Sequence, residues 1–183
     1  MRAKGFVQLH RSLGIPSDYA AGRRLKPQRE ATRLVRIGRS PTGRVLRLTP
    51  AAAAAWRRMQ AAAARDGVVL IAISGFRSVR RQTTIIREKL ATGAPIGAIL
   101  RLVAAPGFSE HHTGRALDIG SAGHLTLEED FGRTREFRWL QRHAGRFGFR
   151  MSYPRGNPHR IGYEPWHWCW RKVRRKRRPD QGV

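Results

Sequence analysis

The chain contains a single cysteine, Cys169, so a disulfide within the chain is excluded. A zinc finger built on several cysteines is excluded for the same reason. No apolar run is long enough to cross a bilayer, and the first ten residues carry positive charge without an apolar stretch of signal-peptide length. We therefore expect no transmembrane segment and no secretion signal in this sequence.

Acidic residues are also scarce. The 183 residues include 12 Asp and Glu against 37 Lys and Arg, which gives a formal net charge of +25. Such an excess predicts attraction to polyanions, such as nucleic acid, anionic lipid or an anionic cell-wall polymer, and it says nothing about the fold. The length suits one domain of ordinary size with a single hydrophobic core, and we expect a monomer.

Three parts of the chain differ in character. Residues 1–45 contain recurrent Arg, Gly and Pro and hold no helical or strand period for long, apart from a candidate short strand at 35–37, so we expect an irregular basic arm wrapped on the domain. Residues 46–170 carry the patterns of helices and strands and are predicted to form the folded domain. Residues 171–183 form a basic tail, rich in Arg and Lys up to residue 178.

The predicted domain mixes helical and strand patterns. Thr49 and Ser78 are typical N-cap residues, Pro50 suits a first helical position, and Thr134 caps a third pattern. Predicted helices cover 51–65, 79–91, 95–103 and 135–146, and predicted strands cover 68–73, 115–119, 149–153 and the aromatic run 161–170.

The segment 109–118, Ser-Glu-His-His-Thr-Gly-Arg-Ala-Leu-Asp, places imidazole and carboxylate, two good zinc ligand types, seven residues apart. In one regular strand His111 and Asp118 would point to opposite faces, because side chains alternate. Gly114 lies between them and makes a turn at low cost, so that both side chains can face one metal ion. On spacing alone, the adjacent His112 competes with His111 for this role.

A third ligand is needed, and Glu164-Pro-Trp-His167 supplies a carboxylate and an imidazole in a segment predicted to be a buried strand. Buried ionisable groups require partners. His167 would complete a set of two histidines and one carboxylate, leaving the fourth tetrahedral position for water. Glu164 could accept the proton of that water. Cys169 is a rival ligand that points the same way in a strand, but between two tryptophans we favour packing as a small apolar group.

Arg77 follows the predicted strand 68–73, at a junction with the next helix where active-site side chains are often displayed. Gln82 lies one turn inside that helix. Composition alone would make Arg77 one solvated arginine among many. Position alone therefore does not assign Arg77 a function.

Together these motifs resemble D-Ala-D-Ala carboxypeptidases of the VanY type, which belong to the zinc peptidases grouped with lysostaphin and the hedgehog domain. The likeness covers about 49–168. It rests on three motifs in order and one aromatic pattern: Ser74-Gly-Phe-Arg-Ser78 with Gln82; Ser109-x-His111-x-x-Gly114-x-Ala116-x-Asp118; Glu164-Pro-Trp-His167; and Trp139-Leu140, Phe147-Gly-Phe149 and Ser152-Tyr-Pro154. This resemblance, rather than the spacing, selects His111 over His112.

The resemblance implies an α+β fold in which a small antiparallel sheet carries the zinc site and helices pack around it. It implies one zinc ion per chain, with site residues in three roles: ligands His111, Asp118 and His167; catalytic residues Glu164 and Arg77; substrate-binding residues Ser109 and Gln82. Glu164 would be the general base. Arg77 would polarise the scissile carbonyl and stabilise its oxyanion.

The implied reaction is removal of the terminal D-Ala from peptidoglycan stem peptides, which places the substrate in the periplasm or cell wall. An endopeptidase of the phage-lysin type on the same scaffold is the alternative, because the difference depends on loops that close the cleft. The basic surface would suit an anionic cell-wall polymer. No recognition motif supports specific nucleic-acid binding, which rests on charge alone. The presence of Glu164 and Arg77 disfavours a non-catalytic zinc module.

Overall fold

The computed structural model describes residues 3–172, with side chains from residue 6 onward, so most of the predicted basic tail lies outside the described residues. The fold is α+β, as predicted. Its helices are α1 (Ala3–Ser12), α2 (Pro50–Arg65), α3 (Val79–Ala91), α4 (Ile96–Leu102) and α5 (Arg135–His143), with short 3-10 turns η1 (Ala21–Arg23), η2 (Glu110–Thr113), η3 (Glu129–Arg133) and η4 (Ala144–Phe147). Its strands are β1 (Val35–Arg39), β2 (Val45–Leu48), β3 (Ile71–Ser74), β4 (Ala116–Gly120), β5 (Phe149–Met151) and β6 (His167–Trp170).

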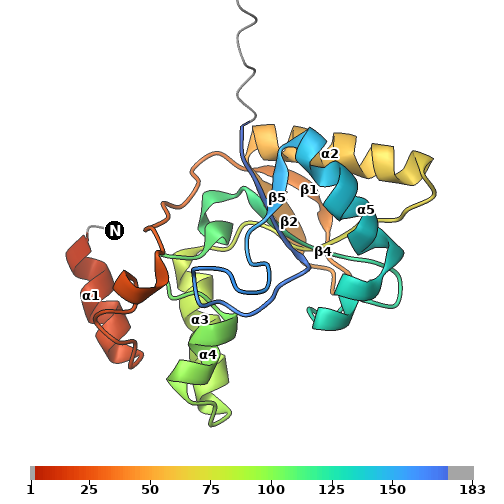
Figure 1. Cartoon of the computed structure of the whole chain (residues 1–183). Helices are drawn as coiled ribbons and strands as arrows, with labels where there is room; N and C mark the ends of the chain where they lie inside the picture. The colour runs from red at the N-terminus through yellow and green to blue at the C-terminus, as the bar shows by residue number, and fades with distance from the viewer. Residues whose placement is uncertain (1–2, 173–183) are drawn as a thin grey trace, which may run out of the picture.

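The centre of the fold is a four-stranded sheet in the order β3-β4-β6-β5, in which every neighbouring pair is antiparallel. Strands β1 and β2 form a separate antiparallel hairpin. Helices α2 and α5 lie together beside the sheet, whereas α3 and α4 extend away on another side and α1 stands at the edge of the molecule (Figure 1). None of the described helices is long and apolar enough to span a bilayer.

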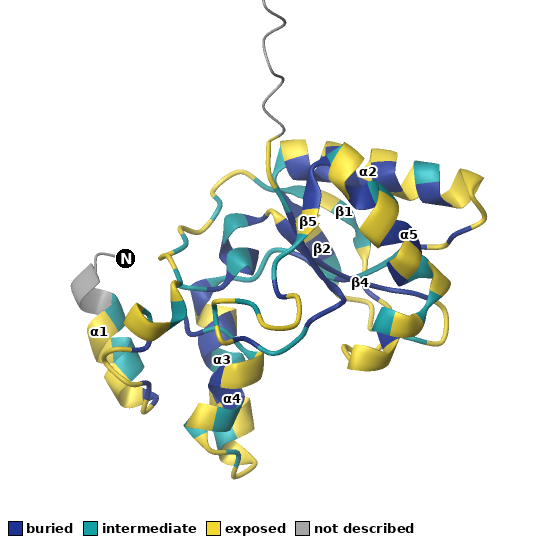
Figure 2. Ribbon diagram, in the orientation of Figure 1, coloured by how far each residue is buried: buried dark blue, intermediate teal, exposed yellow. Residues whose placement is uncertain are grey.

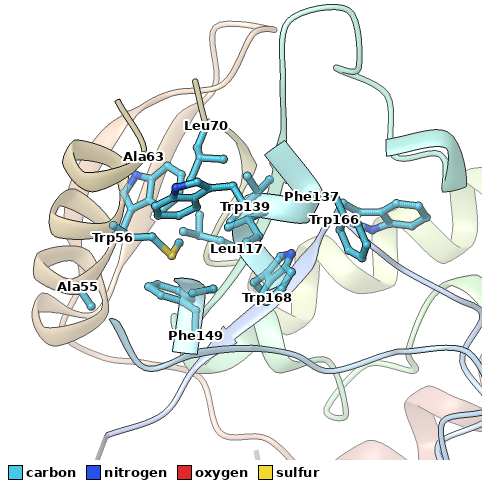
Figure 3. Packing of buried hydrophobic residues seen from close by; sticks show 14 of the residues in the cluster. Ala55, Trp56, Ala63, Leu70, Leu117, Phe137, Trp139, Phe149, Trp166 and Trp168 are labelled. Carbon is cyan, nitrogen blue, oxygen red and sulfur yellow. The ribbon is translucent and has the colours of Figure 1, made fainter. Parts of the chain in front are cut away.

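The main hydrophobic core fills the space between the sheet and helices α2 and α5. Trp56 of α2 packs in one cluster with Leu117 of β4, Phe149 of β5 and Trp168 of β6, all of them buried (Figure 3). Helix α2 buries one stripe and exposes the opposite face (Figure 2). Because strand side chains alternate, the neighbours of these core residues on β4 and β6 must point to the other face of the sheet.

A second, smaller core joins the N-terminal part of the chain to helices α3 and α4. Leu13, Ile15 and Tyr19 are buried with Ile86 and Leu100. The Tyr19 hydroxyl also accepts a hydrogen bond from the backbone N–H of Ala105, at 3.1 Å. This part of the chain therefore contributes packing as well as charge.

The predicted irregular arm, residues 1–45, contains more regular structure than the sequence suggested. It includes helix α1, which the sequence did not predict, and strand β1, which contains the candidate strand 35–37. Strand β1 pairs with β2 across the predicted boundary at residue 45. The apolar side chains that anchor it are scattered singly along the sequence, so no helical or strand period revealed them.

Local capping signals predicted two helix starts correctly. The Ser78 side chain accepts a hydrogen bond from the N–H of Arg81, and the Thr134 side chain accepts one from the N–H of Phe137. Thr49 precedes α2 with an extended backbone but makes no such bond.

The predicted strand over 161–170 is too long. Strand β6 begins only at His167, and Glu164 lies in the turn before it. The N–H of Glu164 donates to the carbonyl of Tyr153 at 3.0 Å, and the N–H of His167 donates back to the carbonyl of Glu164 at 3.1 Å. This turn, rather than strand alternation, sets the direction of the Glu164 side chain.

Gly114 provides a test of the turn that precedes β4. Its φ is +61°, and a Cβ there would lie 2.8 Å from Leu34 Cδ2 and 3.2 Å from Ala31 Cβ. We expect Gly114→Ala to lower the free energy of unfolding by about 2–4 kcal/mol, because backbone strain and overpacking add. Gly93 is the control: its φ is +83°, but a methyl group added there would have no neighbour within 4 Å. Gly93→Ala should cost only about 1–2 kcal/mol, the strain alone. Equal losses in urea denaturation would show that the neighbours of Gly114 adjust freely.

Candidate active site

Two of the predicted metal ligands face each other across adjacent strands. Asp118 of β4 is the register partner of His167 of β6. Paired residues of antiparallel strands point to the same face. The Asp118 Oδ1 atom lies 3.1 Å from His167 Nδ1, and both side chains are buried. Since Leu117 and Trp168 face the hydrophobic core, Asp118 and His167 face the opposite side of the sheet.

The third predicted ligand, His111, comes from the 3-10 turn η2 rather than from a strand. Gly114 ends this turn in the left-handed conformation and redirects the chain into β4. His111 Nε2 thereby comes within 3.2 Å of Asp118 Oδ2. The ligand atoms of His111, Asp118 and His167 all lie within 4.8 Å of one another, and all three residues are buried.

Hydrogen bonds fix which nitrogen of each imidazole faces this cluster. His111 Nδ1 donates to the carbonyl of Gly75 at 2.7 Å, so its Nε2 carries the lone pair. His167 is turned the other way: its Nε2 lies 3.1 Å from the carboxylate of Glu110, and its Nδ1 faces Asp118. Burial lowers the pKa of His111, which favours the neutral form that a metal ligand requires.

The carboxylates around His167 favour a bound cation. Burial opposes charge on His167, but its hydrogen bonds to Asp118 and Glu110 prevail and raise its pKa to about 10. Without a metal ion, the cation that these carboxylates hold is the proton on His167, and a bound metal ion would replace that proton at Nδ1. Burial likewise opposes the charge of Asp118, yet the two histidines hold its pKa well below the usual range. Two imidazoles and one carboxylate are the donor types that zinc prefers in catalytic sites. The residues present therefore fit a zinc ion.

Glu164 approaches the cluster without joining it. Its Oε2 lies 3.7 Å from His167 Nδ1, and it does not belong to the three-residue cluster of ligand atoms. Burial is the main reason that the pKa of Glu164 rises to about 7, and the nearby Asp118 acts in the same direction. A carboxylate with such a pKa can exchange protons near neutrality.

Arg77 is held in the site and is not a solvated surface arginine. Its Nη2 lies 3.6 Å from Asp118 Oδ2, and its side chain is 18% exposed. Arg77 Nη1 donates to Gln82 Oε1 at 3.1 Å, and Nη2 donates to Ser74 Oγ at 3.3 Å. Gln82 is itself fixed, because its Nε2 donates to the carbonyl of Ala104 at 2.6 Å. Burial lowers the pKa of Arg77, while Asp118 and Glu164 oppose that effect.

All the predicted site residues line one cavity of about 230 Å³. Ser109 is among them and is buried. The cavity is also lined by residues to which the sequence assigned no role: Lys89, Leu102, Val103, Leu127, Tyr153, Ile161 and Trp166. Tyr153 lies beside a proposed ligand, with its ring centroid 4.8 Å from that of His167. Burial raises the pKa of Tyr153 well above its usual value, so its hydroxyl keeps its proton.

Both rival ligands lie outside the metal cluster. His112 is fully buried; its Nδ1 donates to the carbonyl of Arg77 at 2.6 Å, and its Nε2 accepts from the N–H of Gly107 at 3.1 Å. It therefore fixes the backbone at Arg77, a role that the sequence did not reveal. Cys169 is buried on strand β6, and burial raises its thiol pKa to about 12, so it stays neutral.

Comparison with known proteins identifies the family. A family model described as VanY, D-alanyl-D-alanine carboxypeptidase, matches residues 45–173. The chain belongs to this family. It is 40% identical over 119 residues to the putative carboxypeptidase YodJ of Bacillus subtilis, covering 63% of this chain and 43% of YodJ. It is 39% identical over 118 residues to a D-alanyl-D-alanine carboxypeptidase of Enterococcus faecalis, covering 58% and 42% respectively. The chain thus spans less than half the length of these two relatives.

Solved structures of VanY-like enzymes share the fold. The LdcB LD-carboxypeptidase superposes with a TM-score of 0.68 at 35% identity, covering 77% of this chain and 69% of LdcB. A mutant of the VanY D,D-pentapeptidase, solved in complex with Zn(II), gives 0.62 at 29% identity, covering 80% and 82%. VanYB in complex with D-alanine-D-alanine gives 0.59 at 28% identity, covering 80% and 81%. The predicted family and fold are thus confirmed.

His112 offers a test of the frame around Arg77. Replacing it with leucine leaves the N–H of Gly107 and the carbonyl of Arg77 without their partner in a buried place. We expect His112→Leu to lower the free energy of unfolding by about 2–5 kcal/mol, because each orphaned group costs about 1–3 kcal/mol. His143→Leu is the control: this imidazole is only half-buried against Trp139, and its loss should cost less than about 1 kcal/mol. Similar losses for both variants in chemical denaturation would contradict the bridging role.

Proposed function

We propose that this protein is a zinc-dependent D-alanyl-D-alanine carboxypeptidase that removes the terminal D-Ala from peptidoglycan stem peptides. The observation that carries the proposal is the buried cluster of His111, Asp118 and His167, with Glu164 and Arg77 beside it in one cavity. The similarity to VanY structures solved with Zn(II) and with D-alanine-D-alanine supports it.

Zinc would be held by Nε2 of His111, a carboxylate oxygen of Asp118 and Nδ1 of His167, the atoms that face one another in the cluster. When bound, zinc supplies a Lewis acid that polarises the scissile carbonyl and lowers the pKa of water. We expect one zinc ion per chain, since the described residues offer one such cluster.

Glu164 is proposed as the general base and later the acid. Burial raises its pKa to about 7 in the metal-free site, and a bound zinc ion would lower that pKa and favour the carboxylate form. The carboxylate would take a proton from the attacking water and return it to the leaving amine. Its place beside the cluster, rather than in it, leaves its carboxylate free for this task.

Arg77 is proposed to stabilise the oxyanion that develops on the scissile carbonyl. Its guanidinium is fixed by Gln82 and Ser74, so the donors need little reorganisation during the reaction. Because Gln82 accepts from Arg77 and donates to the carbonyl of Ala104, part of its proposed role is to orient Arg77. Ser109 lines the same cavity and is proposed to bind the substrate backbone or its terminal carboxylate.

Two related activities remain as second candidates. The structural likeness to LdcB, an LD-carboxypeptidase, favours a test of peptides that end in a single D-Ala next to an L-centre. An endopeptidase that cuts cross-linked peptides is the other. The exposed cavity residues, including Leu102 and Leu127, which are 60% and 39% exposed, would determine which of these peptides can enter.

The proposal is tested by mass spectrometry of muropeptides incubated with the zinc-loaded protein. Pentapeptides should lose one terminal D-Ala. Loss of D-Ala from tetrapeptides instead would indicate an LD-carboxypeptidase, and release of internal fragments from cross-linked dimers would indicate an endopeptidase. No change in any of these peptides, with zinc bound, would refute a peptidase acting on cell-wall peptides.

Glu164→Gln separates chemistry from metal binding. The variant should keep about one zinc per chain but lose hydrolysis by about 10²–10⁴-fold, the usual contribution of a general base. Glu129→Gln removes the same charge on the surface, from a residue paired with Arg155, and should leave the rate unchanged. If Glu164→Gln retained full activity, the base would have to be another group.

We also propose that the hairpin β1–β2 binds an anionic cell-wall polymer. Residues 31–65 contain no Asp or Glu, and Arg36 and Arg47 are register partners, both exposed. Like charges directly opposite one another across strands are destabilising, and a bound polyanion would relieve that repulsion. The hairpin borders the active site, because the N–H of Phe76 donates to the carbonyl of Arg47 at 2.8 Å.

Binding to soluble poly(glycerol phosphate) at low salt tests this surface. The triple variant Arg33→Gln, Arg36→Gln, Arg47→Gln should bind at least about tenfold more weakly. A protein surface with fewer cations displaces fewer counterions from the phosphates of the polymer, and this release drives binding. The control triple Arg142→Gln, Arg146→Gln, Arg150→Gln lowers the net charge equally with exposed residues elsewhere. Equal weakening by the two triples would mean that only net charge matters and that the hairpin is not a specific site.

A further inference from the structure

Glu110 lies between two residues of the predicted motif, Ser109 and His111, and neither the motif nor the charge pattern gives it a task. We propose that Glu110 is a positioning residue for the metal ligand His167. Its carboxylate fixes the imidazole so that Nδ1, and not Nε2, faces the metal. The inference rests on the proposed zinc site, and it concerns the affinity of that site rather than the reaction.

The geometry around the His167 ring supports this role. Nε2 lies 3.1 Å from Glu110 Oε2 on one side, and Nδ1 lies 3.1 Å from Asp118 Oδ1 on the other. Both neighbouring carboxylates can only accept, so each ring nitrogen can hold a proton while no metal ion is bound. Once a metal ion replaces the proton on Nδ1, the one remaining N–H is at Nε2, where the carboxylate of Glu110 accepts it. The lone pair then remains on Nδ1, the nitrogen within the ligand cluster.

Glu110 is itself held in place. Ser152 Oγ donates to the same oxygen, Oε2, that faces His167, and Arg171 Nη2 lies 3.6 Å from the other oxygen, Oε1. The side chain is only 16% exposed. Residues from η2, from the end of β5 and from the end of β6 thus meet at one carboxylate. A fixed acceptor can fix the ring that donates to it, whereas a solvated one could not.

Glu110 lies outside the cavity that contains the proposed catalytic residues Arg77 and Glu164. It lines a second cavity instead, of about 330 Å³. Its carboxylate meets the imidazole edge opposite to Nδ1, so a metal bound at Nδ1 is separated from it by the ring. The contact therefore acts on the metal only through His167.

The short turn η2 thus orients both imidazole ligands. Within η2, His111 donates its Nδ1–H to Gly75 and turns Nε2 to the cluster, while the preceding Glu110 turns Nδ1 of His167 to it. The two imidazole ligands therefore carry their protons on opposite ring nitrogens. This opposite pair of tautomers is a direct signature of the proposal.

The first test is the zinc dissociation constant, measured by competition with a chelator. Loss of a partner that orients a ligand typically weakens metal binding by about 10–100-fold, and we expect this for Glu110→Ala. Glu110→Gln keeps an acceptor oxygen but loses the charge, so its effect should be smaller. Glu129→Gln, the surface control, should bind zinc as the original chain does. An unchanged constant in both Glu110 variants would overturn the proposal.

The second test reads the tautomers and does not depend on a variant that folds poorly. Nitrogen-15 NMR of the imidazoles in the zinc-loaded chain should show His111 protonated at Nδ1 and His167 protonated at Nε2. In Glu110→Gln the His167 signals should broaden or shift while those of His111 stay. A His167 ring protonated at Nδ1 in the zinc-loaded chain would refute the proposal. If zinc binds and the tautomers are as expected but no muropeptide is cut, the proposed function fails while this inference stands.

Discussion

The register of β4 against β6 is the constraint on which the rest of the structure depends. It places Asp118 opposite His167 on one face of the sheet and Leu117 opposite Trp168 on the other. A slip by one residue would put the charged pair into the apolar core and the apolar pair into the cavity. The packing of Trp168 and Leu117 against α2 and α5 therefore holds the two proposed ligands together from the opposite face of the sheet.

Three of the few acidic residues in this basic chain lie around one histidine. Asp118, Glu164 and Glu110 are gathered around His167, where they are buried or nearly so. Among the described arginines, Arg77 approaches this group from the cavity side and Arg171 from the opposite side. The remaining positive charge lies largely on the surface. The charged groups around His167 are thus distinct from the surface charge that is expected to attract polyanions.

The sequence predicts those features that depend on residues close together in the chain or on a family motif. Ser78 and Thr134 were recognised as caps because their partners lie within three residues. The roles of Glu110 and His112 were missed because they depend on contacts with His167 and Arg77, far along the chain. The strand over 161–170 was overextended for a similar reason: aromatic residues favour a strand, but a backbone bond to Tyr153 fixes the turn at Glu164.

The turn η2 and the junction between β3 and α3 are joined by three hydrogen bonds. The N–H of Arg77 donates to the carbonyl of His111 at 3.2 Å, His112 donates to the carbonyl of Arg77, and His111 donates to the carbonyl of Gly75. The backbone that carries the proposed catalytic arginine and the backbone that carries the proposed metal ligand are therefore tied to each other. The exposed cavity residues Leu102 and Leu127 take no part in these bonds, so they can change without moving the proposed catalytic groups. Such a scaffold separates the evolution of substrate choice from the evolution of rate.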